Sequence, residues 1–203
     1  MAIRLRLCPF AAIDELVPRE GELVDIACGH GHLALLLASG APDRHVRAVD
    51  IDERKIAAAR EARGRAGIEP AQVEFDVVPA DFVPAGPVDA ITLVDAAYLL
   101  GDETAERLVR SSAAALAPGG VLLVKEMDMD RRAKAFVACA GELVMTKLAG
   151  ITASTDGQVE FIAPRRIEGW MRDEGLTTTS ERWDRGYPVP HHAVYGRRPA
   201  AQG

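Results

Sequence analysis

Two carboxylates follow apolar runs near the start of the chain. Asp25 lies close to the end of the first run and Asp50 ends the second. Between them, Gly29 and Gly31 form a turn that opens a helix-like stretch. Glycines let the backbone pass close to a ligand, and the N-terminus of a helix offers unpaired N–H groups to an anion. A carboxylate at the end of the second strand is placed to accept hydrogen bonds from ribose hydroxyls. These residues therefore predict a nucleoside-containing ligand.

The same turn satisfies a looser pattern, Gly29-x-Gly31-x-x-Ala34, which is typical of folds that bind a dinucleotide. A nicotinamide or flavin enzyme is therefore one interpretation of this region. The end of the chain argues against it. Residues 177–183 and 192–197 are β-prone runs joined by a short link, which predicts an antiparallel hairpin. A dinucleotide-binding domain of two similar halves would instead continue with strand, helix and strand.

Five segments in order resemble the motifs of class I S-adenosylmethionine-dependent methyltransferases. The first is Asp25-Ile26-Ala27-Cys28-Gly29-His30-Gly31, and the others begin at Asp50, Pro79, Val88 and Leu116. The resemblance covers almost the whole chain. It implies S-adenosyl-L-methionine as the cofactor and S-adenosyl-L-homocysteine as its product.

The resemblance also implies roles for individual residues. By the family's pattern, Asp50 binds the ribose, Ile51 packs against the adenine and Asp95 lies beside the methionine end. The implied cofactor-binding residues are Asp25, Ala27, Gly29, Gly31, Asp50, Ile51, Asp81, Phe82 and Asp95. Ala27 stands where many relatives carry glycine. Without the resemblance, Asp25 and Asp50 serve equally well as caps for the structure that follows them.

The alternation of strands and helices predicts a Rossmann-like α/β fold. The expected strands are 22–27, 46–50, 73–78, 88–94, 120–125, 177–183 and 192–197; the expected helices are 9–18, 31–40, 53–66, 103–116, 131–149 and one that begins at Pro164. A mostly parallel sheet that ends in an antiparallel hairpin, with helices on both faces, is the seven-stranded methyltransferase sheet. We expect one domain over 1–198 and a flexible tail at 199–203. Within that domain, helix 131–149 of the acceptor segment 127–165 is either a mobile lid or a permanently packed helix.

Composition narrows the class of protein. The hydrophobic fraction of 48% and the charged fraction of 27% are ordinary for a globular chain. No apolar run approaches the ~20 residues of a membrane span, and no segment reads as a signal peptide. The net charge of −6 argues against a nucleic-acid ligand. The 3 cysteines are far apart, which argues against a disulfide framework, so we expect a cytoplasmic protein.

Two further motifs carry weaker signals. His30 and His32 have a spacing that metal sites use, but zinc needs more ligands, and we expect loop contacts and no metal. The segment 95–98 occupies the place of the Asn/Asp-Pro-Pro-Tyr motif of amine methyltransferases, but it lacks both prolines, so that chemistry is disfavoured. Its Tyr98 is either a wall of the acceptor site or a core residue. Glu126 either hydrogen-bonds a substrate or lies at a solvated strand end.

Tyr187 and His191 are the predicted catalytic residues. They lie between the last two strands, in a connection that should leave the ligand-binding edge of the sheet. With an ordinary pKa of ~6.5, His191 is suited to accept a proton from a hydroxyl acceptor, while Tyr187 orients that acceptor. His192 should point to the opposite face. The alternative is that this connection only stiffens the hairpin.

The resemblance implies methyl transfer to a small molecule or a carrier-bound intermediate, and O-methylation is the favoured reaction. Two alternatives remain. One is a methyltransferase-like protein that binds the cofactor without catalysis. The other is an RNA methyltransferase, against which the negative charge and the lack of interleaved aromatic and basic residues argue. The sequence leaves the oligomeric state open.

Overall fold

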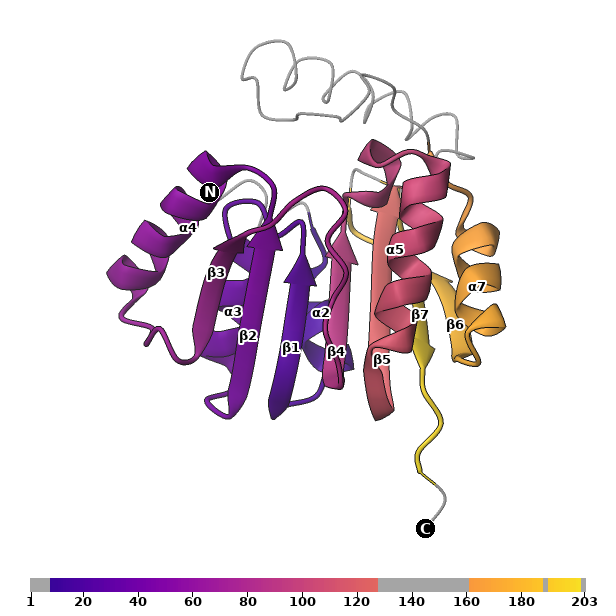
Figure 1. Cartoon of the computed structure of the whole chain (residues 1–203), viewed down its shortest axis with the longest axis horizontal. Helices are drawn as coiled ribbons and strands as arrows, with labels where there is room; N and C mark the ends of the chain where they lie inside the picture. Colours follow the sequence, from indigo (N-terminus) through magenta and orange to yellow (C-terminus); the bar gives the residue numbers. More distant parts are fainter. Residues whose placement is uncertain (1–7, 128–160, 188–189, 202–203) are drawn as a thin grey trace.

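The computed structural model describes residues 8–127, 161–187 and 190–201. These residues form a seven-stranded sheet in the order β3-β2-β1-β4-β5-β7-β6 (Figure 1). The strands are β1 (Gly21–Ile26), β2 (Arg44–Asp50), β3 (Val73–Val77), β4 (Val88–Val94), β5 (Leu116–Met127), β6 (Thr177–Arg182) and β7 (His191–Arg197). The helices are α2 (Phe10–Leu16), α3 (His32–Gly40), α4 (Glu53–Ala66), η1 (Ala97–Leu99), α5 (Asp102–Ala114) and α7 (Pro164–Asp173). The expected helix 131–149, and with it the proposed lid, lies outside the described residues.

The strand directions are those that the sequence predicts. Strands β1 to β5 pair in parallel with one another, whereas β7 pairs antiparallel with both β5 and β6. Strand β6 therefore runs in the direction of the first five strands, and the last two strands form the expected hairpin. The carboxyl ends of the parallel strands meet at one edge of the sheet, which is where open α/β sheets bind their ligands.

Alternate side chains of the strands enter two separate hydrophobic cores, because successive strand residues point to opposite faces. One core contains Val24 and Leu122 and packs against α5 and α7. The other contains Leu23 and Leu123 and packs against α2, α3 and α4. In Figure 1, α2 and α3 lie behind the sheet and α5 lies in front of it. Helices of the described part of the chain thus cover both faces, and the carboxyl edge is where a ligand is expected.

The start of the fifth strand differs from the sequence prediction. The helix expected at 103–116 is α5, which ends at Ala114, and the strand expected at 120–125 already begins at Leu116. The sequence assigns Leu116 to the end of the helix because its spacing from the apolar residues before it is helical. In the structure Leu116 pairs with Val88 of β4, and this pairing draws it into the sheet.

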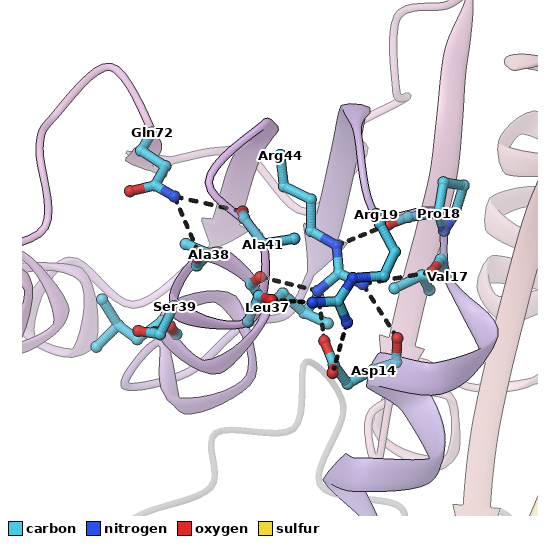
Figure 2. Close-up of polar contacts among 12 residues, drawn as sticks. Asp14, Val17, Pro18, Arg19, Leu37, Ala38, Ser39, Ala41, Arg44 and Gln72 are labelled. Atoms are coloured by element: carbon cyan, nitrogen blue, oxygen red, sulfur yellow. Dashed lines mark hydrogen bonds and ion pairs between the residues drawn. The ribbon is translucent and has the colours of Figure 1, made fainter.

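A buried arginine joins α2, α3 and β2 at the opposite edge of the sheet (Figure 2). Arg44, the first residue of β2, is fully buried and forms an ion pair with the carboxylate of Asp14. Its guanidinium also donates to the carbonyl oxygens of Leu37 (2.8 Å) and Pro18 (2.6 Å). A buried charge is tolerated only when it is paired and hydrogen-bonded in this way. The role of Arg44 is therefore structural.

Candidate active site

The loop between β1 and α3 has the backbone shape that a close ligand approach requires. Ala27, Gly29 and Gly31 all have positive φ, at 57°, 56° and 72°. A Cβ on Gly31 would lie 2.5 Å from the ring of Phe75, so only glycine fits there. A Cβ on Gly29 would meet nothing within 4 Å. The space beside Gly29 is therefore open, while its φ still favours glycine.

Asp50 ends β2 and is fixed to this loop. Only 6% of the residue is exposed. Its Oδ2 accepts a hydrogen bond from the N–H of Gly29 (2.8 Å), and its Oδ1 accepts one from the N–H of Asp52 (2.9 Å). A carboxylate has about four acceptor positions, so Asp50 can accept further hydrogen bonds from a ligand. The next residue, Ile51, is 48% exposed and offers an apolar surface beside this carboxylate.

Asp25, the residue before the last of β1, is buried in the sheet. It is 2% exposed, and its Oδ1 accepts a hydrogen bond from the hydroxyl of Thr92 on β4 (2.8 Å). Burial, and next the charges of Asp25 and Asp50, raise the pKa of the Cys28 thiol. Cys28 is therefore a neutral thiol, and both carboxylates act on the same point of the loop.

Asp81 and Phe82 follow β3 at the same edge of the sheet. Asp81 is exposed, whereas Phe82 is partly buried, and the guanidinium of Arg47 lies 5.9 Å from the centre of its ring. The connection to Asp50 is direct, since the N–H of Val78 donates to the backbone carbonyl of Asp50 (3.1 Å). The structure thus places this pair in the loop that follows β3, the strand next to the one that Asp50 ends.

Asp95 follows β4 with a left-handed backbone, at φ 54°. Its Oδ1 lies 2.6 Å from Nζ of Lys125, whose side chain is fully buried. The N–H of Asp95 also donates to the carbonyl oxygen of Lys125 (2.8 Å). These contacts hold the carboxyl ends of β4 and β5 together. They lie next to β1, the strand that leads into the glycine loop, because β4 pairs with β1.

Glu126 is not at a solvated strand end. It is 4% exposed, and its Oε1 accepts hydrogen bonds from the N–H groups of Ala96 (3.1 Å) and Ala97 (2.8 Å). Burial, with the negative charge of Asp95 second, raises the pKa of this carboxyl to about 8. Tyr98, the residue after Ala97, is buried and stacks on Phe161 with ring centres 5.5 Å apart. The apolar run 121–124 before Lys125 indicates a buried strand, but it does not indicate the state of the Glu126 carboxyl.

Tyr187 and His191 lie together, with ring centres 5.3 Å apart in an edge-to-face arrangement. The sequence predicts that His191 lies in the connection between the last two strands. In the structure it is instead the first residue of β7. It pairs with Met127, the last residue of β5, so it lies at the carboxyl edge; only 3% of it is exposed. His192 points to the opposite face, as predicted, and its Nε2 lies 2.9 Å from the hydroxyl of Ser180.

The structure brings some of the predicted residues into direct contact and leaves others apart. Gly29 and Asp50 are hydrogen-bonded, while Tyr187 and His191 form a second group two strands beyond β4. The rings of His30 and His32 have centres 6.0 Å apart. Within the described part of the chain, no group of three or more His, Cys, Asp or Glu residues could hold a metal ion. No helix in that part is long and apolar enough to cross a membrane.

Comparison with known proteins identifies the family. Residues 23–120 match a family model described as a methyltransferase domain. The chain is 34% identical over 156 residues to a demethylmenaquinone methyltransferase of Thermus thermophilus, covering 76% of this chain and 69% of that protein. It is also 34% identical over 112 residues to a trans-aconitate 2-methyltransferase of Variovorax paradoxus, covering 55% of this chain and 40% of that protein.

Solved structures agree on the fold. An O-methyltransferase family protein from Burkholderia thailandensis superposes with a TM-score of 0.75 at 21% identity, over 96% of this chain and 56% of that one. The YcgJ protein of Bacillus subtilis superposes with a TM-score of 0.68 at 16% identity, over 95% of this chain and 98% of that one. The chain thus spans little more than half of the first of these structures. It belongs to the class I S-adenosylmethionine-dependent methyltransferases, and the cofactor of that family is S-adenosylmethionine.

The residues present fit this cofactor. Open space beside Gly29 and the spare acceptor positions of Asp50 suit a ribose, and exposed Ile51 suits a flat apolar ring. Ala27, where the resemblance implies glycine in many relatives, adopts a left-handed backbone that glycine adopts more easily.

Proposed function

We propose that this protein transfers a methyl group from S-adenosylmethionine to a small molecule or a carrier-bound intermediate, with oxygen as the favoured acceptor atom. The observation that carries the proposal is the hydrogen bond between Gly29 and Asp50, beside open space and an exposed apolar residue. The two relatives described above are named for methyl transfer to demethylmenaquinone and to trans-aconitate, which supports a small-molecule acceptor.

Each cofactor residue has a distinct task in this proposal. Asp50 accepts hydrogen bonds from the ribose hydroxyls, and Ile51 covers one side of the adenine. Asp81 and Phe82, in the loop after the neighbouring strand β3, contact the other side of the adenine. Asp95 faces the methionine end, where its ion pair with Lys125 keeps it in place. Asp25 stabilises the strand end before the loop, where its carboxylate accepts a hydrogen bond from Thr92 of β4.

The bound cofactor supplies a methyl group already activated on a positively charged sulfur, so the protein's main contributions are alignment of the acceptor and exclusion of water. A hydroxyl acceptor with a high pKa also needs a base. We assign that role to His191, with Tyr187 orienting the acceptor, because the two rings meet at the carboxyl edge. His191 is buried, which suits a base that works away from water.

The test of the class of reaction has two parts. Calorimetry should detect binding of S-adenosylhomocysteine and no binding of NAD; binding of NAD alone would contradict the assignment. A cell extract incubated with the protein and methyl-labelled cofactor is then separated into protein, nucleic-acid and small-molecule fractions. Label should enter the small-molecule fraction, or the protein fraction if the acceptor is bound to a carrier protein. Label in RNA would instead support the RNA methyltransferase, and binding without any transfer would support the non-catalytic alternative.

A further inference from the structure

Glu126 uses only half of its carboxyl group. Its Oε1 accepts two backbone N–H groups, those of Ala96 and Ala97. Its Oε2 is buried and has no hydrogen-bond partner among residues 8–127, 161–187 and 190–201. A buried polar atom without a partner costs free energy, and native proteins rarely leave one without a reason. The atom therefore marks a place where a ligand group can bind.

The charges around Glu126 decide which form of the carboxyl is present. Asp95, at the end of β4, carries a negative charge that disfavours ionisation, and Lys125 offsets this only weakly, since it is paired with Asp95. On β7, His192 lies opposite Glu126 in the sheet, and Arg182 of β6 lies opposite His192. With burial as the largest cause, the pKa of Glu126 is about 8, so the neutral acid is the main form at pH 7.

The position of the proton follows from the hydrogen bonds. Because Oε1 accepts from two N–H groups, a neutral carboxyl carries its proton on Oε2. The side chain is then a hydrogen-bond donor whose partner must bring an acceptor oxygen or nitrogen. It lies beside η1, where Tyr98 stacks on Phe161, and beside Asp95. In the proposed function, Asp95 faces the methionine end of the cofactor and Tyr98 is the expected wall of the acceptor site, so a donor at this point would lie between them.

We propose that Glu126 is an acceptor-binding residue: Oε1 holds the start of η1 in place, and the hydroxyl at Oε2 donates a hydrogen bond to a carbonyl or carboxylate oxygen of the methyl acceptor. This inference rests on the proposed function, because it takes the segment from Asp95 to Tyr98 as the boundary between cofactor and acceptor. It predicts that the acceptor carries a carbonyl or carboxylate oxygen close to the atom that is methylated.

The proposal is tested with two substitutions of Glu126. In Glu126→Gln the amide oxygen can still accept from Ala96 and Ala97, and the amide nitrogen can still donate, but the group no longer titrates. In Glu126→Ala both functions are lost. The small-molecule fraction of a cell extract serves as the acceptor, with methyl-labelled cofactor, and the amount of extract that gives half-maximal transfer is measured at pH 7 and pH 9.

In the wild type, the half-maximal amount should rise by roughly tenfold between pH 7 and pH 9, because ionisation removes the donor. Glu126→Gln should stay within about threefold of the wild type at pH 7 and should not change at pH 9. Glu126→Ala should need about tenfold more extract already at pH 7. Equal behaviour of Gln and Ala variants at pH 7, or a Gln variant that keeps the pH dependence, would overturn the proposal.

Binding of S-adenosylhomocysteine separates failure of this inference from failure of the proposed function. All three proteins should bind it with similar affinity, which also shows that the variants are folded. A wild type that binds but transfers no label would contradict the proposed function and remove the basis of the inference. If Glu126→Ala does not fold, the comparison of Glu126→Gln with the wild type at the two pH values still decides the question.

Discussion

Asp50 and Glu126 are two carboxyl side chains near the ends of parallel strands, and each accepts two backbone N–H groups. Asp50 takes one N–H on each oxygen, whereas Glu126 takes both on the same oxygen. Asp50 adjoins open space at Gly29 and an exposed isoleucine, but Glu126 is covered and lies beside a second carboxylate. The edge near Asp50 thus presents a carboxylate that is hydrogen-bonded on both oxygens and adjoins open space, and the end of β5 presents a buried acid.

This difference shows that the same local feature serves two kinds of chemistry. A carboxylate near the end of an apolar strand can accept hydrogen bonds from nearby N–H groups on both oxygens. It becomes a proton carrier when one oxygen is desolvated and a like charge is near. What packs above the strand end decides between the two outcomes.

The largest expected effect concerns the acceptor side. His191→Ala should lower kcat by about 10²–10⁴-fold, the usual contribution of a general base, while the affinity for S-adenosylhomocysteine stays nearly unchanged. His192→Ala is the matched control: it removes the neighbouring ring on the opposite face and should be much milder. Initial rates with methyl-labelled cofactor and titration calorimetry measure both quantities. Full activity of His191→Ala would leave alignment of the acceptor as the main catalytic contribution.

A second prediction concerns pH and stability. The pKa of Glu126 is about 8 in the folded protein and 4.5 as the ordinary value, so the folded state holds this proton more strongly than the unfolded state. Its contribution to stability is fully present below pH 4.5 and is lost as the pH rises to about 8. The free energy of unfolding of the wild type should therefore fall by about 1 kcal/mol per pH unit over this window relative to Glu126→Gln.

Urea denaturation of the wild type and Glu126→Gln at several pH values between 5 and 8 measures this difference. Glu74→Gln, which changes an exposed side chain on β3, is the control and should show the pH dependence of the wild type. A difference between the wild type and Glu126→Gln that is independent of pH would show that Glu126 is ionised throughout this range.

The third prediction tests the cofactor side. Asp50→Ala should weaken binding of S-adenosylhomocysteine by about 1.5–3 kcal/mol, the scale for hydrogen bonds to a charged group. Asp43→Ala removes an exposed carboxylate just before the other end of β2 and should leave the affinity unchanged. Titration calorimetry gives both values. An Asp50→Ala variant with wild-type affinity would mean that the ribose is held elsewhere.

The smallest expected effect concerns Ala27. Its φ of 57° costs an L-residue about 1–2 kcal/mol, and glycine removes that cost but gains about 0.4–1 kcal/mol of unfolded-state entropy. Ala27→Gly should therefore raise the free energy of unfolding by about 0.5 kcal/mol. Ala57→Gly, at an exposed position within α4, should lower it by about 1 kcal/mol. If both substitutions destabilise equally, the left-handed backbone at Ala27 is not under strain.

Much of the fold followed from local patterns. The glycine turn, the apolar strands and the Pro and Gly residues around α7 predict element order and strand direction, and the bounds 53–66 of α4 agree in full. The main error, at Leu116, arose where pairing with another strand overrode helical spacing. His191 was placed in a connection for a similar reason, since its strand pairing with Met127 is a long-range contact.

The site divides in the same way. The sequence by itself determined the turn between β1 and α3 and the position of Asp50 beside it, because both belong to motifs whose geometry is set by a few consecutive residues and one parallel pairing. Only the tertiary structure decided the state of Glu126. Its burial, the nearby charge of Asp95 and the two N–H groups of η1 come from separate elements that meet at the end of β5. Electrostatic environments depend on such long-range packing, and no local pattern encodes it.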